Sequence, residues 1–205
     1  RRMASYFLRV PEGAARGRRD AAQGAMFEED LKGNEYLLDL ANLLRQRLQD
    51  WRDRRYEGAT KVTRELIDLW RAPDRSQPLF YAQIEAAETV LFLVEGPADL
   101  LQGIQVPPDE PGASAKKDGY KAFLRYALKM ATGSGKTTVM GMLAAWSILN
   151  KVTDPQNAAY SDTVLIVCPN VTIRDRLPVL NPERDEFSLD RTRELLIGGI
   201  PLRQA

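Results

Sequence analysis

Apolar residues recur at steps of three and four between residues 34 and 95, the spacing that places side chains on one face of a helix. Polar residues suited to capping, together with glycine and proline, separate three such series. The pattern therefore predicts three amphipathic helices whose apolar faces form a core. Their expected limits are Asn34 to Gly58, Thr60 or Thr63 to Pro73, and Pro78 to Gly96.

After residue 120 the pattern changes from helical spacing to short apolar runs. Residues 123–130 and 163–168 are mainly apolar, and the second run is nearly continuous, as in a parallel strand covered on both faces. A helix is expected at 136–150 between them, and a short one at 172–180 after them. The order strand, helix, strand, helix predicts a parallel α/β unit.

The segment between the two strand-like elements carries the clearest chemical signal. Residues 131–137 read Ala-Thr-Gly-Ser-Gly-Lys-Thr. Glycines let backbone amides approach a phosphate, the following helix directs its N-terminus at it, and the lysine bridges the outer phosphates. The residues expected to bind ATP are Thr132, Gly133, Ser134, Gly135, Lys136, Thr137 and Thr138, with Lys136 and Thr137 catalytic and the Thr137 hydroxyl a ligand of Mg²⁺. Thr138 has packing as its alternative role.

A second signal lies upstream, in the helix expected at 78–95. Gln83 precedes the phosphate loop where helicase-like motors carry a glutamine that recognises adenine. A glutamine amide both donates and accepts, so it suits the edge of that base. Phe80, or Tyr81 in its place, is expected to stack on the base. The alternative for Gln83 is an ordinary surface position on a helix.

A third signal follows the second strand-like run, which ends at Pro169. Residues 164–174 resemble motif Ia of superfamily-two helicases, where a strand ends in proline and the next groups hold a nucleic-acid backbone. The residues expected to contact DNA phosphates are Pro169, Asn170, Thr172 and Arg174. A capped helix after a strand explains Thr172 equally well.

Taken together, residues 33–180 resemble the DEAD/DEAH-like helicases related to the Res subunits of type III restriction enzymes. The segments that carry the resemblance are 33–36, 80–89, 126–133 and 167–170. Met130 stands where the generic phosphate-loop signature has glycine, but the superfamily-two form Ala-x-x-Gly-x-Gly-Lys-Thr matches residues 131–137. The resemblance implies ATP-driven translocation or unwinding of DNA, in restriction or defence against foreign DNA. The partners it implies are DNA and a methyltransferase, nuclease or other defence subunit.

The expected fold class is α/β, an incomplete RecA-like parallel-sheet P-loop domain preceded by a helical N-terminal region. The domain limits are an irregular basic segment at 1–33, helices at 34–95, a flexible Pro/Gly-rich loop at 96–120, and a truncated RecA-like domain at 121–205. The acidic motif that activates water is missing, because Asp185-Glu186 follows a polar stretch instead of a strand. We therefore expect the N-terminal part of a DNA-stimulated ATPase, inactive by itself.

Composition narrows the chemistry further. The chain has no histidine and one cysteine, Cys168, which excludes Ser-His-Asp hydrolysis, histidine-ligated zinc and an internal disulfide. A net charge of +1 neither supports nor opposes nucleic-acid binding. The arginines at 16, 18 and 19 suit either a solvated tail or a phosphate contact. With no apolar stretch long enough to span a membrane, we expect a cytoplasmic protein.

Two other function classes fit part of the pattern. A nucleotide-binding regulatory module without turnover would bind ATP and present residues 34–95 to a partner. A P-loop kinase acting on a small molecule would use arginines after the loop, such as Arg174 and Arg176, in a lid. Stimulation by DNA distinguishes the helicase interpretation from both.

Overall fold

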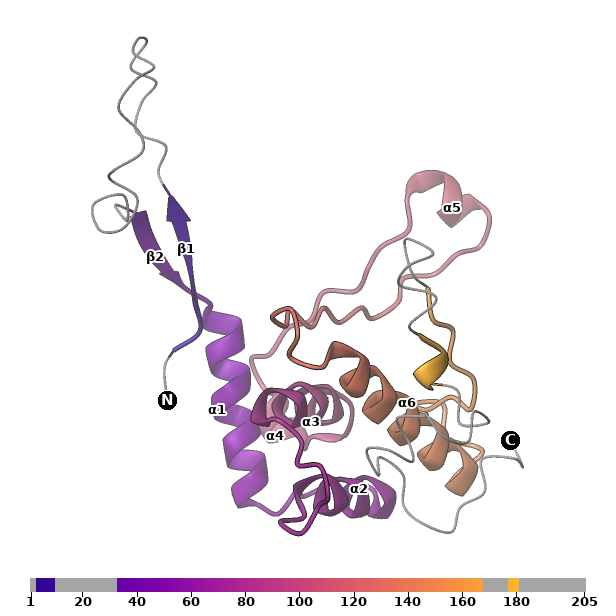
Figure 1. Ribbon diagram of the computed structural model, residues 1–205. Helices are drawn as coiled ribbons and strands as arrows, with labels where there is room; N and C mark the ends of the chain where they lie inside the picture. Colours follow the sequence, from indigo (N-terminus) through magenta and orange to yellow (C-terminus); the bar gives the residue numbers. More distant parts are fainter. Residues whose placement is uncertain (1–2, 10–32, 168–176, 181–205) are drawn as a thin grey trace. The chain divides into compact units, whose positions relative to one another are not determined.

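The computed structural model describes residues 3–9, 33–167 and 177–180 (Figure 1). By contacts between its residues, the chain divides into two compact units, Arg1–Arg47 and Leu48–Ala205. Helix α1 (Asp39–Asp53) contributes residues to both. Each unit is described by itself.

The first unit contains a two-stranded antiparallel sheet. Strand β1 (Ser5–Arg9) pairs with β2 (Gly33–Leu37), in a register that sets Ser5 opposite Leu37 and Arg9 opposite Gly33. At the base of the hairpin, the Asn42 side chain both accepts from the Ala4 amide (2.7 Å) and donates to its carbonyl (3.0 Å). These contacts tie the strands to the beginning of α1.

This hairpin differs from the sequence-based expectation. The segment 1–33 was expected to be irregular, yet its residues 5–9 form a strand, and the first helix starts at Asp39 instead of after Asn34. Twenty-three residues lie between Arg9 and Gly33, so no local period reveals the pairing. The aromatic residues of the two strands, Tyr6, Phe7 and Tyr36, favour extended structure, which overrides the helical spacing at 34–37.

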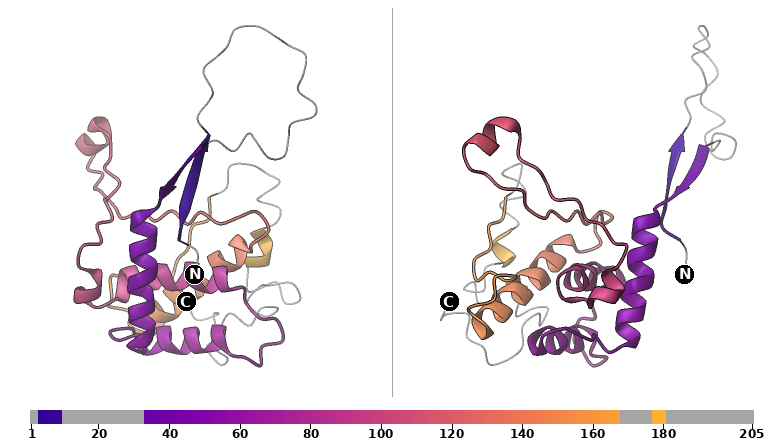
Figure 2. Two further views of the ribbon diagram at one scale, coloured as in Figure 1. Left: turned by 90° about the vertical axis from the view of Figure 1, so that its left-hand side faces the viewer. Right: turned by 180° about the vertical axis from the view of Figure 1, so that it is seen from behind.

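The second unit is built from helices. Helices α2 (Lys61–Arg71), α3 (Tyr81–Glu95) and α6 (Lys136–Thr153) pack on one another, and they lie together in both views of Figure 2. Each spans a stretch in which the sequence predicts a helix. The core consists of large side chains that are almost fully buried, among them Leu48, Trp51, Leu66, Ile67, Trp70, Leu91, Phe92, Met142 and Leu149.

A polar network inside this core joins α6 to the other two helices. The Glu95 carboxylate accepts hydrogen bonds from the Thr60 amide (2.9 Å), the Thr63 hydroxyl (2.6 Å) and the Trp146 indole (2.7 Å). Asn150 bonds to Thr60 (2.6 Å) and to Thr63 (3.2 Å). Because partly buried polar groups are favourable only when satisfied, these bonds fix how α6 sits against α2 and α3.

Residues 96–130 connect α3 to the phosphate loop. The stretch expected as a flexible loop contains the short helices α4 (Ala98–Leu101) and α5 (Ala113–Lys117). A single antiparallel bridge between Asp109 and Phe123 closes the base of the excursion that carries α5. Near the other end of the described chain, Leu177–Leu180 form a 3-10 turn, η1, within the stretch expected as a short helix.

The two strands predicted on either side of α6 are not seen among the described residues. Apart from the Asp109–Phe123 bridge, residues 123–130 and 163–167 lie outside any strand, and Leu165 is 87% exposed. A helix satisfies its backbone hydrogen bonds within itself, whereas a strand needs a neighbour on at least one side. The parallel sheet expected from these runs is therefore not seen in the part of the chain that the structure describes.

Candidate nucleotide-binding site

The loop before α6 adopts the backbone conformation that its glycines permit. Gly133 and Gly135 have φ angles of 79° and 83°, in the left-handed region that side chains disfavour. Gly135 is the residue that caps α6. A Cβ atom added to Gly133 would meet nothing within 4 Å, so space beside this glycine is open.

The first backbone amides of α6 are available to a ligand. Val139 donates to the Gly135 carbonyl (3.2 Å), which is the first hydrogen bond of the helical pattern. Within the described residues, the amides of Lys136, Thr137 and Thr138 donate to no protein carbonyl. Unpaired amides at a helix N-terminus, together with the helix dipole, form a site for an anion.

The Lys136 side chain lies along the same loop. Its ammonium donates to the carbonyl oxygens of Ala131 (2.9 Å) and Met130 (3.2 Å), and the Ser134 hydroxyl also donates to Ala131 (2.7 Å). These contacts give the loop its compact turn. Lys136 remains exposed, so its ammonium is accessible from solvent.

Gln83 lies directly beside the phosphate loop, although 52 positions separate it from Gly135. A Cβ atom at Gly135 would overlap the Gln83 amide nitrogen, and the Gln83 side chain is 97% buried, with 3% exposed. The Gln83 carbonyl oxygen accepts from the Phe80 amide (2.8 Å) and so caps α3. The structure thus brings Gln83 and the loop together, and it places Gln83 in the interior instead of on the helix surface.

The two aromatic residues next to Gln83 differ in their surroundings. Phe80 is 65% exposed, and Tyr81 is 50% exposed. The Tyr81 hydroxyl accepts a hydrogen bond from Arg52 of α1 (3.3 Å), whose guanidinium carbon lies 5.9 Å from the Tyr81 ring centroid. Of the two rings left open by the sequence, Phe80 is the more accessible for stacking.

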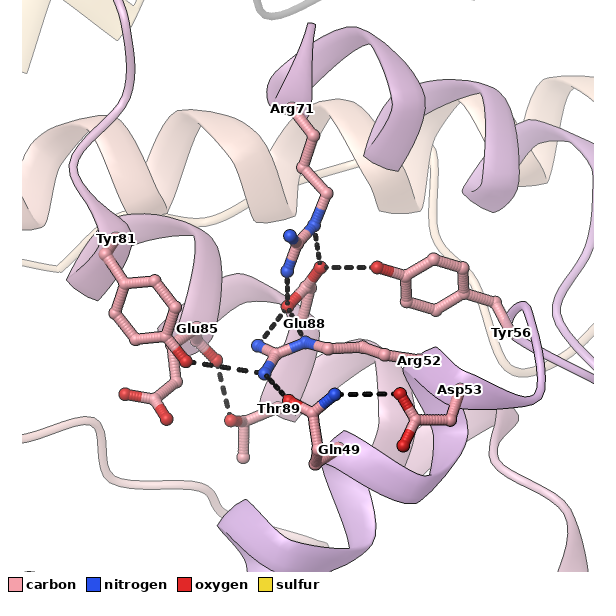
Figure 3. A network of polar contacts seen from close by, with 9 residues as sticks. All are labelled: Gln49, Arg52, Asp53, Tyr56, Arg71, Tyr81, Glu85, Glu88 and Thr89. Carbon is pink, nitrogen blue, oxygen red and sulfur yellow. Dashed lines mark hydrogen bonds and ion pairs between the residues drawn. The ribbon is translucent and has the colours of Figure 1, made fainter. Parts of the chain in front are cut away.

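An ionic cluster centred on Glu88 (Figure 3) lies in α3, five residues after Gln83. Glu88 is fully buried and accepts hydrogen bonds from Arg52 through two nitrogens, from Arg71 through two nitrogens, and from the Tyr56 hydroxyl (2.9 Å). Its hydrogen bond to Glu88 raises the pKa of Arg71, and burial, followed by the Glu88 charge, raises the pKa of Tyr56. The cluster joins α1, α2 and α3 at the helix that carries Gln83.

Sequence reasoning did not identify this cluster. The available signal was a carboxylate at position 88 between Ala87 and Leu91, which both lie on the buried face of the helix. A charged residue on an apolar helical face requires an opposite charge. The sequence does not show which of its many arginines supply that charge, because Arg52 lies 36 residues before Glu88.

The residues expected to contact DNA lie outside the described part of the chain. These are Pro169, Asn170, Thr172 and Arg174, and the Asp185-Glu186 pair lies outside it as well. In the described residues no group of three or more acidic, cysteine or histidine side chains could hold a metal ion. Thr137 is accordingly the candidate Mg²⁺ ligand that the structure describes.

The family model of the type III restriction enzyme, res subunit, matches residues 76–187, more than half of the chain. The chain belongs to this family. Searches of curated proteins and of solved structures gave no match. The Res family is part of the DEAD/DEAH-like helicase superfamily, which has a RecA-like P-loop fold and generally uses ATP and Mg²⁺.

The Res-family match covers Gln83, the phosphate loop and α6. Arg52, Tyr56 and Arg71 of the Glu88 cluster lie before its first residue. The resemblance to the Res subunits of type III restriction enzymes, which the sequence indicated, is therefore confirmed at the level of the family. Helix-rich as it is, the described part of the chain contains no helix long and apolar enough to cross a membrane.

Proposed function

We propose that the chain binds ATP with Mg²⁺ and belongs to a DNA-stimulated motor of the restriction or defence type. The observation that carries this proposal is the contact between Gln83 and Gly135. It joins a base-recognising residue type to a phosphate-binding loop, and a nucleotide contains both a base and phosphates. Family membership supports the helicase type of enzyme.

The residues present fit a nucleoside triphosphate. The amides of Lys136, Thr137 and Thr138 are available to phosphate oxygens, and the Gly133 side of the loop has room for them. The Lys136 ammonium, on leaving its bonds to Met130 and Ala131, bridges the outer phosphates. The Thr137 hydroxyl would be one protein ligand of Mg²⁺, a cation that usually also takes a carboxylate, substrate phosphates and water.

At the base end, Gln83 recognises adenine and Phe80 stacks on it. The Gln83 oxygen has a second lone pair beyond the one that accepts from the Phe80 amide. The exposed ring of Phe80 offers a face to the base, and a base stacked on an aromatic ring is worth roughly 1–3 kcal/mol. This part of the proposal predicts a preference for ATP over a triphosphate that lacks a base.

The DNA-binding part of the proposal concerns the segment after α6. Pro169, Asn170, Thr172 and Arg174 hold the phosphate backbone. Where neighbouring strands are supplied, the apolar runs at 123–130 and 163–168 form parallel strands of a RecA-like sheet. Both runs contain exposed apolar residues, for example Leu124 and Leu165, which helices packed on the faces of such a sheet would cover. Cytoplasmic location follows from the same function.

Calorimetric titration of the chain with MgATP tests this function. We expect binding by the wild type and a loss of about tenfold or more in Lys136→Ala, since each charge-assisted hydrogen bond to phosphate contributes about 1.5–3 kcal/mol. Lys121→Ala is the matched control, because Lys121 is also exposed but lies outside the loop. Equal affinity in all three proteins would refute the proposal.

The helicase aspect needs a separate measurement. ATP hydrolysis by the full-length protein should rise when duplex DNA is added, and Lys136→Ala should abolish both the basal and the stimulated rate. Nucleotide binding with no hydrolysis in the presence of DNA would instead favour a regulatory module.

A further inference from the structure

The segment from α5 to the phosphate loop concentrates positive charge. Residues 113–136 contain six lysines and arginines and a single carboxylate, Asp118, whereas the whole chain has a net charge of only +1. Lys136 belongs to the nucleotide site. The cations that precede it have no role in that site; they are Lys116, Lys117, Lys121, Arg125 and Lys129. A cationic segment within a nearly neutral chain is one signal of a surface that binds a polyanion.

The bridge between Asp109 and Phe123 shows which side chains of this segment share a side. The Asp109 amide donates to the Phe123 carbonyl (2.7 Å), and the Phe123 amide donates to the Asp109 carbonyl (3.3 Å), so the two residues stand directly opposite each other. Opposite residues point to the same side of an antiparallel pair, and so do residues two positions apart. The ion pair between Arg125 and Asp109 (2.8 Å) agrees with this arrangement. Phe123 and Arg125 therefore lie on one side, and the same period places Lys121 there.

The two sides of the segment differ in chemistry. Lys121, Phe123 and Arg125, called the cationic face below, alternate in sequence with the apolar residues Ala122 and Leu124. Apolar residues continue at the even positions up to 130. A strand with this alternation packs one side on a core and turns the other to solvent. Burial of the Leu124 side against helices therefore leaves the cationic face open.

The cationic face combines an exposed ring with an accessible ammonium group. The Phe123 side chain is 58% exposed, and Lys121 is exposed and forms no ion pair within residues 33–167. A cation beside an exposed aromatic ring is the combination that holds single-stranded nucleic acid, because the cation contacts a phosphate and the ring stacks on an unpaired base. In a duplex the base faces are already stacked on each other, so the ring favours a single strand.

We propose that the cationic face binds single-stranded DNA, with Lys121 on a phosphate and the Phe123 ring on a base. Asp109 limits the affinity, because its carboxylate lies on the same side and pairs with Arg125. This inference goes beyond the proposed function, since it needs neither ATP nor the segment at 169–174.

Fluorescence anisotropy of a labelled oligodeoxythymidylate, titrated with the full chain in the absence of nucleotide, tests this surface. We expect Lys121→Ala to weaken binding about threefold or more. The same variant should lower the slope of log affinity against log salt by about 0.7, the value of one phosphate contact on a single strand. Phe123→Leu should weaken binding about fivefold or more at an unchanged salt slope, because it removes the stacking ring but no charge. Lys61→Ala is the matched control, since Lys61 is an exposed lysine of α2.

Asp109→Asn should give an effect of the opposite sign. It keeps the backbone bridge and the size of the side chain, but it removes the negative charge and frees Arg125 for a phosphate. We expect the probe to bind about two- to fivefold more tightly, the effect of one surface charge.

Three results would each overturn the inference: unchanged affinity in Phe123→Leu, equal losses in Lys121→Ala and Lys61→Ala, or no gain in Asp109→Asn. Tighter binding of a duplex than of a single strand of the same length would overturn it as well. Because Lys121 and Phe123 are exposed, their substitution removes no core packing. The proposed function fails by a different result, an unchanged MgATP affinity in Lys136→Ala, which leaves the DNA affinities as they are.

Discussion

Two apolar regions of the molecule differ in how far they are buried. One is the helical core around α2, α3 and α6, and the other is the pair of apolar runs at 123–130 and 163–167. Both are rich in apolar residues, yet Leu91 in α3 is fully buried whereas Leu165 is 87% exposed. The helices close their backbone hydrogen bonds locally and need only a partner for one face. The runs need neighbouring strands, and the described residues supply none, so apolar content alone does not decide burial.

The largest expected effect is a difference in the free energy of unfolding between a variant in the helical core and a variant in the apolar runs. Leu91→Ala removes a fully buried side chain and should lower the free energy of unfolding by about 2–5 kcal/mol. Leu165→Ala removes an exposed one and should change it by no more than about 0.5 kcal/mol. Urea unfolding followed by circular dichroism measures both. A similar loss in the two variants would show that the 163–167 run is packed in solution.

A smaller effect, on ATP binding, is expected from substitutions of the two glycines that lie between residues 123–130 and α6. Gly135→Ala strains a positive φ and collides with Gln83, whereas Gly133→Ala has the same strain and open space. A residue held at such a φ costs on the order of 1–3 kcal/mol. We therefore expect weaker ATP binding in Gly135→Ala than in Gly133→Ala, measured by titration calorimetry.

The Gly135 prediction has a built-in check. Adding Gln83→Ala to Gly135→Ala removes the atom that the new methyl group meets, so the loop should regain part of its thermal stability. If the double variant is as unstable as the sum of the single ones, Gln83 and Gly135 are not in contact.

The smallest expected effect lies within the helical core and depends on pH. Tyr56→Phe loses the hydrogen bond to Glu88 and should cost about 1 kcal/mol at pH 8. Because the pKa of Tyr56 is raised in the folded chain, this contribution is complete below the unfolded pKa of about 10 and is lost as pH rises above it. The stability difference between wild type and variant should then shrink between pH 10 and 11, and a constant difference would contradict the assignment.

The parts of this molecule that were predictable from sequence are those with local signals. Helical spacing located α2, α3 and α6, and the order of glycine, lysine and threonine located the phosphate loop. Glycines at 133 and 135 do adopt positive φ angles, as close approach to a phosphate requires. Family membership agrees with the same residues.

The parts that were not predictable depend on partners distant in sequence. The hairpin joins residues 5–9 to 33–37, and the Glu88 cluster joins arginines from two other helices to α3. The contact between Gln83 and Gly135 belongs to the same class, since nothing local to either residue sets their distance. The predicted strands are not seen in the described residues for the converse reason: their local signal was strong, but strand formation is not a local property.

The central claim is that the loop at 131–135 and the first amides of α6 hold a triphosphate. Amide hydrogen exchange of the chain, measured with and without saturating MgATP, tests it at the atoms concerned. We predict slower exchange at residues 133–138 when ATP is present, and less slowing in Lys136→Ala at the same ATP concentration. Unchanged exchange across this segment in the wild type, at an ATP concentration that saturates binding, would contradict the account.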